Sequence, residues 1–226
     1  MDKGEKYIRD LIRQGEHQQL DFKYAVNDSR KIARSLVAFA NSQGGTLLIG
    51  VKDNGRIAGV RSEEEIYMIE TAAIIFCRPE VKYTITIHEI EEKTVVEVTV
   101  PPSADRPYKA PDDHDRWHVY VRVNDTNRLA NNILVRSWKR KMRPRGTFVE
   151  YTEPEKALLH YLSHHKTISQ GMLRKIAAIP HHAAANILVN FLAWEVIKPV
   201  FTDKGIRYKL NDEPSRTTNH ELRTTN

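Results

Sequence analysis

The sequence predicts an α+β protein with two domains, and two patterns support this prediction. Helical and strand periodicities alternate through the first part of the chain, whereas residues 151–210 show three helical stretches followed by two short strands. Three helices and a two-stranded wing are typical of a winged helix-turn-helix domain. We therefore expect a mixed sheet with flanking helices over 1–142, a linker over 143–150, a winged helix over 151–210 and a disordered tail over 211–226.

The first half of the first domain should contain two helices and a strand hairpin. Gly15 ends the first amphipathic helix, and a strand of alternating apolar residues follows. Asp28 caps the second helix. Asn54-Gly55 lies between two apolar runs and predicts a type I′ turn, in which both central residues need a positive φ. The expected elements are a helix over 3–14, a strand over 18–26, a helix over 30–41 and strands over 46–51 and 56–59.

The second half of this domain should contain two helices and three strands. Ser62 and Glu65 form a capping box at the start of a helix, and Pro101-Pro102 ends a strand. The polar residues 103–115 should form an exposed loop. The expected elements are a helix over 63–77, strands over 81–90, 94–100 and 117–123, and a short basic helix over 131–141.

Composition favours a basic, cytoplasmic protein. The chain has 226 residues, of which 40% are hydrophobic, and its formal net charge is +6. This sign suits a polyanionic partner such as DNA or RNA. The single cysteine, Cys77, excludes an internal disulfide. The sequence shows neither a charged-then-apolar leader nor an apolar run of about 18 residues, so we expect no membrane association.

One group of acidic residues could bind a metal ion. Asp21 and Lys23 are two residues apart on a predicted strand and so share a face, and Asp53 follows the next strand. With Glu16, these carboxylates could hold Mg²⁺ or Mn²⁺ for phosphodiester hydrolysis. On spacing alone, the same residues more often form only a loop residue, a solvated strand face and a turn, and both interpretations stay open.

A second group could contact nucleic acid. Residues 106–128 interleave bases with aromatic and amide side chains, a composition that can bind phosphates and stack on bases. An ordinary exposed strand and loop would have a similar composition. The candidate contacts in this region are Arg106, Lys109, Tyr120, Arg122 and Arg128, together with Lys23 near the acidic group.

The predicted winged helix has an unusual charge distribution. Its third helix, which would be the recognition helix, should expose His181, His182, Asn186 and Asn190 and carries no Arg or Lys. Basic residues lie elsewhere, and we take Arg174 and Lys204 as candidate nucleic-acid contacts. This domain could therefore serve protein contacts as readily as DNA.

Residues 5–130 resemble the Schlafen AlbA-like DNA-binding domain, a family common in bacterial proteins and in animal Schlafens. The resemblance implies an α/β domain that binds nucleic acid, and many bacterial relatives continue into a winged helix. Some animal members cleave structured RNA with three carboxylates, which correspond by motif position to Glu16, Asp21 and Asp53, with Asp21 replacing the more usual Glu. The matching motifs are Glu16, Leu20-Asp21-Phe22-Lys23, Ala38-Phe39-Ala40-Asn41, Gly44-Gly45, Leu48-Ile49-Gly50-Val51-Lys52-Asp53, Gly59-Val60 and Tyr120-Val121-Arg122.

Three functional hypotheses follow. The first is a bacterial nucleic-acid-binding protein, such as a transcriptional regulator, that needs no cofactor to bind. The second is a Mg²⁺- or Mn²⁺-dependent endoribonuclease that uses the three carboxylates as ligands and Lys23 to stabilise charge. The third is a protein-interaction or dimerisation module, for which the base-poor third helix of the winged domain argues, with a homodimer as its simplest form.

Overall fold

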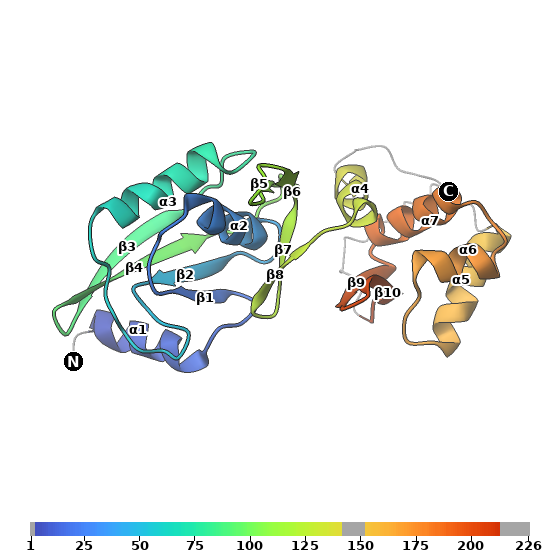
Figure 1. Ribbon diagram of the computed structural model, residues 1–226. Helices are drawn as coiled ribbons and strands as arrows, with labels where there is room; N and C mark the ends of the chain where they lie inside the picture. The colour runs from blue at the N-terminus through green and yellow to red at the C-terminus, as the bar shows by residue number, and fades with distance from the viewer. Residues whose placement is uncertain (1–2, 142–151, 213–226) are drawn as a thin grey trace, which may run out of the picture. The chain divides into compact units, whose positions relative to one another are not determined.

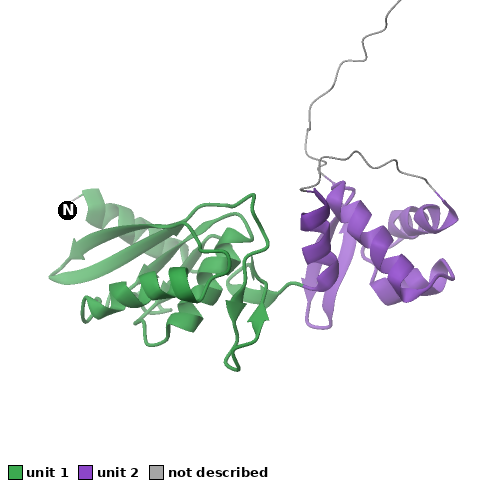
Figure 2. Cartoon of the chain, turned by 90° about the horizontal axis from the view of Figure 1, so that it is seen from above, with its two compact units in different colours: residues 1–130 green, residues 131–226 purple. Residues whose placement is uncertain are grey.

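The computed structural model describes residues 3–141 and 152–212. The predicted linker over 143–150 lies outside the described residues, as does the predicted tail apart from Asn211 and Asp212. The chain divides into two compact units, unit 1 over residues 1–130 and unit 2 over residues 131–226 (Figure 2).

Unit 1 is built on a four-stranded mixed sheet in the order β1-β2-β4-β3. β1 and β2 are parallel, and the other neighbouring strands are antiparallel. A helix connects β1 to β2, as a parallel pair requires. The confirmed α+β class thus rests on a mixed sheet with flanking helices. The strands are β1 (Leu20–Lys23), β2 (Gly45–Ile49), β3 (Thr84–Ile90) and β4 (Lys93–Val100).

Helices cover both faces of this sheet (Figure 1). The larger core lies beneath α2 (Ser29–Ala40) and α3 (Glu64–Ile75) and includes Phe39 and Ile69. The smaller core lies on the other face, where Ile8 of α1 (Lys3–Gln14) packs with Phe22. Nine of the twelve residues of α2 are buried, because its C-terminal half, residues 35–40, carries only apolar or small side chains.

Two predicted strand pairs differ from the structure. Of Asn54 and Gly55, only Gly55 has a positive φ, of 79°, so these two residues do not form a type I′ turn. The returning strand is reduced to one bridge between Val51 and Ile57. The predicted strand over 117–123 is two strands, each with its own short partner. These pairs are β5 (Ala110–Pro111) with β6 (Trp117–His118), and β7 (Tyr120–Val123) with β8 (Thr126–Leu129).

Unit 2 contains the three helices and the hairpin expected over 151–210, together with α4 (Asn132–Lys141). The predicted boundary at residue 142 assigned α4 to the first domain, whereas the structure groups it with unit 2. α4 packs against α7, and Arg136 donates a hydrogen bond to Asn186 Oδ1. The other elements are α5 (Glu153–His164), α6 (Gln170–Ile176), α7 (His181–Ala193), β9 (Ile197–Thr202) and β10 (Gly205–Leu210).

Within the described ranges, no single helix is long and apolar enough to cross a membrane. α6 and α7 together pass the same test on length and composition alone, with a bend of 114° between them.

Candidate nucleic-acid interface

Arg122 lies at the centre of a buried polar network in unit 1. Its side chain is 2% exposed, and its Nη2 lies 3.2 Å from Asp21 Oδ1. The guanidinium also faces the ring of Phe39, 5.4 Å from its centroid. Its remaining N–H groups donate to Leu20 O at 3.1 Å, His17 O at 3.4 Å and Asn127 Oδ1 at 3.3 Å.

This burial corrects the prediction that Arg122 contacts phosphates. The alternation along β7 suggested that Arg122 points to solvent, opposite Val121. The structure instead gives Arg122 an internal role, joining β7 to the strand β1 through a buried ion pair. Tyr120 is also buried, at 9% exposure, so its ring has little surface on which a base could stack.

Asp21 receives hydrogen bonds and charge from several sides. Its Oδ2 accepts from Ser35 Oγ at 3.2 Å and lies 3.0 Å from Lys23 Nζ. Burial alone would raise the pKa of Asp21, but Lys23, a hydrogen bond from Glu16 and the charge of Arg122 together lower it. Asp21 is therefore held as a carboxylate. Lys23, a predicted phosphate contact, is occupied mainly with Asp21 and with Phe22 O at 2.8 Å.

Glu16 and Asp21 form a carboxyl pair whose pKa values shift in opposite directions. Burial and the hydrogen bond to Asp21 raise the pKa of Glu16, although the N–H of Phe22, 2.8 Å from Oε1, acts in the opposite direction. The pKa of Asp21 is lowered, so a proton that binds to the pair binds first to Glu16, which then donates to Asp21.

The third predicted ligand, Asp53, is exposed in the turn after β2. Among the described residues, no group of three or more His, Cys, Asp or Glu side chains is placed to hold a metal ion. The structure brings Glu16 and Asp21 together without Asp53, and Asp21 already binds two cations. This arrangement does not fit a three-carboxylate centre for Mg²⁺ or Mn²⁺.

A group of basic and aromatic side chains lies where β5 and β6 meet the end of α3. Two of its members, Trp117 and His118, are half-buried, and His118 Nε2 lies 3.1 Å from Asp112 Oδ2. The guanidinium of Arg78 stacks over the ring of Trp117, 3.9 Å from its centroid. Two backbone hydrogen bonds, of 2.9 and 2.8 Å, join Arg78 to Lys109. We call Arg78, Lys109, Trp117 and His118 the aromatic–basic cluster. Arg78 and Lys109 are both exposed, and neither makes an ion pair with any described residue.

Other basic residues nearby are neutralised. The loop between β5 and β6 carries aspartates that pair with bases of α2 and of the loop itself. These pairs are Arg30 with Asp115, Arg34 with Asp113, and Arg116 with Asp112, at 3.1, 2.6 and 2.9 Å. Arg78 and Lys109 of the cluster therefore remain exposed to solvent, whereas the three arginines beside the cluster form ion pairs with aspartates of the loop.

A buried amide fixes the position of the cluster. Asn41 Nδ2 donates to the carbonyls of Tyr108 and Tyr120 at 2.9 and 2.8 Å, and its Oδ1 accepts from Tyr108 N at 2.8 Å. Tyr108, which is next to Lys109, and Tyr120, which is two residues after His118, are thus tied to the end of α2. Arg106 lies close by and donates to Asn41 O at 3.1 Å.

The remaining predicted contacts do not belong to the cluster. Arg128 is exposed on β8 in unit 1. In unit 2, Arg174 is exposed on α6 and Lys204 is exposed in the turn between β9 and β10. Sequence reasoning missed Arg78, because some thirty residues separate it from the 106–128 region and no local pattern marks it.

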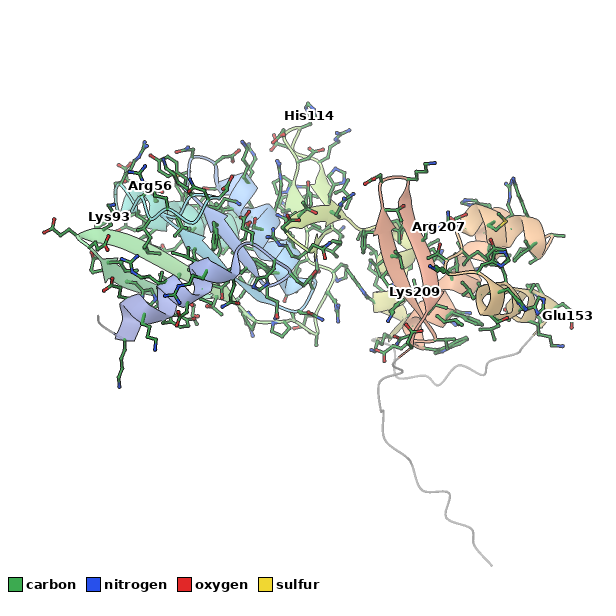
Figure 3. The ribbon with its side chains drawn as sticks, turned by 90° about the horizontal axis from the view of Figure 1, so that it is seen from below. Arg56, Lys93, His114, Glu153, Arg207 and Lys209 are labelled. Atoms are coloured by element: carbon green, nitrogen blue, oxygen red, sulfur yellow. The ribbon has the colours of Figure 1, made fainter. Side chains whose placement is uncertain are left out.

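The helix α7 is a poor surface for a nucleic-acid groove. Most of its length is buried, and Asn190 is half-buried rather than exposed as predicted. Asn186 is exposed but bound by Arg136 of α4. Basic side chains gather instead on the hairpin, where Figure 3 labels Arg207 and Lys209. Beside it lies a groove of about 550 Å³, lined in part by His164, His165, Lys166 and Lys209.

Comparisons with known proteins identify one family, and the solved structures that resemble the chain include the following two. A family model described as "Schlafen, AlbA_2" matches residues 16–131. A crystal structure of the DIP2311 protein from Corynebacterium diphtheriae is 20% identical, with a TM-score of 0.42, over 58% of this chain and 25% of that chain. The chain thus spans a quarter of that protein's length.

The second structure is a solution structure of the N-terminal domain of a putative ATP-dependent DNA helicase RecG-related protein from Nitrosomonas europaea. It is 16% identical, with a TM-score of 0.38, over 68% of this chain and 99% of that chain. No curated protein matches the chain.

Replacing Arg122 by alanine should destabilise unit 1. The change removes the buried partner of Asp21 and the donor to the carbonyls of His17 and Leu20, at a cost of about 3–5 kcal/mol. Urea denaturation followed by circular dichroism measures this. Arg116→Ala is the control, because its exposed pair with Asp112 should contribute about 1 kcal/mol or less. Wild-type stability of Arg122→Ala combined with weaker nucleic-acid binding would restore the phosphate role.

Glu16→Gln should stabilise the protein at neutral pH relative to the wild type. Folding raises the pKa of Glu16, so the free energy of unfolding falls as the pH rises from the ordinary pKa of 4.5 through the raised pKa. Glutamine does not titrate, and its amide can still donate a hydrogen bond to Asp21. Urea denaturation across this pH range should show that the unfolding free energy of Glu16→Gln exceeds that of the wild type by an amount that grows with pH. A difference that is constant, or that shrinks with pH, contradicts the raised pKa of Glu16.

Proposed function

The chain belongs to the Schlafen AlbA_2 family, and we propose that it is a nucleic-acid-binding protein whose unit 1 contacts its ligand through the aromatic–basic cluster. The observation that carries this proposal is the stacked pair of Arg78 and Trp117 beside the exposed Lys109. Basic side chains bind phosphates without sequence preference, and planar aromatic or guanidinium groups stack on bases.

The preferred ligand is an unpaired stretch of DNA or RNA. Bases can stack on a side chain only when they are not stacked within a duplex, and such contacts are tolerant of sequence. Arg78, Lys109 and Arg106 would supply the phosphate contacts, and Arg128 would extend them along β8. Arg122 is absent from this set because it is buried.

Unit 2 is proposed to act as a winged helix that adds a second contact. The order of three helices and a hairpin supports this assignment. Since α4 packs on α7, the contact would come from the hairpin and α6, through Lys204 and Arg174, rather than from a recognition helix. A protein with two such modules suits a bacterial transcriptional regulator in the cytoplasm.

Lys109→Ala and Arg78→Ala should each weaken binding to single-stranded DNA and RNA and flatten its dependence on salt. Each lost phosphate contact should reduce the slope of log K against log salt by about 0.7. Fluorescence anisotropy with labelled oligonucleotides across a salt series measures both. Trp117→Ala should weaken binding without changing the slope, because a stacking contact releases no counterion.

The matched controls are Lys6→Ala and Arg56→Ala, which remove exposed bases far from the cluster in sequence; Figure 3 labels Arg56. Their slopes and affinities should equal those of the wild type. The proposal fails if the wild-type protein shows no salt-dependent binding, or if the controls lose as much as the cluster variants.

RNA incubated with the protein and Mn²⁺ should remain intact, because the carboxylates do not form a three-ligand centre in this arrangement. tRNA and rRNA are suitable substrates, analysed on denaturing gels. Asp53→Ala is the matched control. Cleavage by the wild-type protein that Asp53→Ala abolishes would instead establish the nuclease hypothesis.

A further inference from the structure

β3 is an edge strand of the unit 1 sheet, next to β4 alone. Its sequence, Thr84-Ile85-Thr86-Ile87-His88-Glu89-Ile90, has no proline or lysine, and its register with β4 has no bulge. Proteins usually protect a long edge with such features, because its open N–H and C=O groups can pair with another strand. Among the described residues, no other strand pairs with the outer side of β3.

The outward backbone groups of β3 are symmetric about Ile87. A two-residue turn, in which Glu91 and Glu92 have φ values of 50° and 60°, closes the β3–β4 hairpin on Ile90 and Lys93. Such a turn closes on a hydrogen-bonded pair, and hydrogen-bonded pairs then alternate along the ladder. The backbone N–H and C=O groups of the even-numbered residues of β3 therefore form hydrogen bonds with β4. The N–H and C=O groups of Ile85, Ile87 and Glu89 point away from the sheet.

Large apolar side chains lie exposed beside this edge. Ile87 is 54% exposed, and Tyr67 and Ile74 on α3 are 64% and 60% exposed. α3 lies along β3 (Figure 1), and burial together with the charge of Glu70 on α3 raises the pKa of Tyr83, which precedes β3. Tyr67 and Ile74 lie within about one turn of Glu70 on the same face of α3.

We infer that β3 pairs antiparallel with β3 of a second copy of this chain, about a two-fold axis at Ile87. In this register the two Ile87 residues exchange both backbone hydrogen bonds, and Ile85 of each copy bonds to Glu89 of the other. The two sheets become one sheet of eight strands. Antiparallel pairing about such an axis keeps like faces together, so α3 of one copy approaches α3 of the other.

The chemistry of the edge favours a second copy over an unrelated peptide. The three outward residues are evenly spaced about Ile87, so the edge is complementary to itself in this register. The same register places Lys82 opposite Glu92 of the second copy. The two-fold axis repeats this pair, so opposite charges meet at both ends of the interface. Isoleucine and tyrosine side chains occupy its centre, where both copies bury them.

Light scattering coupled to gel filtration should give a mass twice the 26.1 kDa of the chain. Ile87→Lys should give a monomer, because it places two ammonium groups together at the axis. Leu129→Lys is the matched control, since Leu129 is also 54% exposed, and it should remain a dimer. Circular dichroism should show that both variants are folded.

A cysteine variant tests the register directly. The only native cysteine, Cys77, is 2% exposed, so Ile87→Cys provides the single accessible thiol. Directly opposed strand residues lie about 5.5 Å apart between Cα atoms, within the range of a disulfide. Mild oxidation should link the Ile87→Cys chains into a covalent dimer on a non-reducing gel, and Leu129→Cys should remain uncrosslinked.

Three results would overturn this interface: a monomeric wild-type protein at the highest soluble concentration, a dimer that Ile87→Lys leaves intact, or equal crosslinking of the two cysteine variants.

Discussion

The buried ion pair between Arg122 and Asp21 is the constraint on which unit 1 depends. Two charges are withdrawn from water, and their mutual attraction offsets that loss only if the remaining polar atoms also find partners. The structure meets this requirement with main-chain carbonyls, Ser35, Asn127 and Lys23 around the pair. The pair thereby fastens β7 and β8, which belong to a separate small sheet, to the edge strand β1.

This fastening determines where the exposed cluster lies. β7 follows β6 after a single residue, so holding β7 in place also positions Trp117 and His118. Gln18 assists at the far end of the hairpin, donating to Arg122 O at 2.7 Å and accepting from Asn124 N at 3.0 Å. The network beneath the surface therefore fixes the orientation of the proposed stacking surface.

Much of unit 1 was predictable because local pattern determines it. Apolar periodicity identified α1, α2 and the strands of the main sheet, and Asp28 does cap α2, accepting from Arg30 N at 2.9 Å. The role of Arg122 was not predictable, since an arginine alternating with valines has the pattern of a solvated strand face. Only the distant Asp21 makes its burial favourable. Arg78 reaches Trp117 through tertiary packing alone, which leaves no signal in its own segment.

The carboxylates illustrate the same limit. Motif position predicted that Glu16, Asp21 and Asp53 act together as metal ligands. In the structure Asp21 forms ion pairs with Arg122 and Lys23, and Asp53 is exposed in a turn. The most direct test of the account is an NMR titration with single-stranded DNA and RNA that follows the three tryptophan indole N–H signals. We predict that the Trp117 signal shifts early and saturates with binding. A titration that saturates while only the Trp138 or Trp194 signals move would contradict the proposed surface.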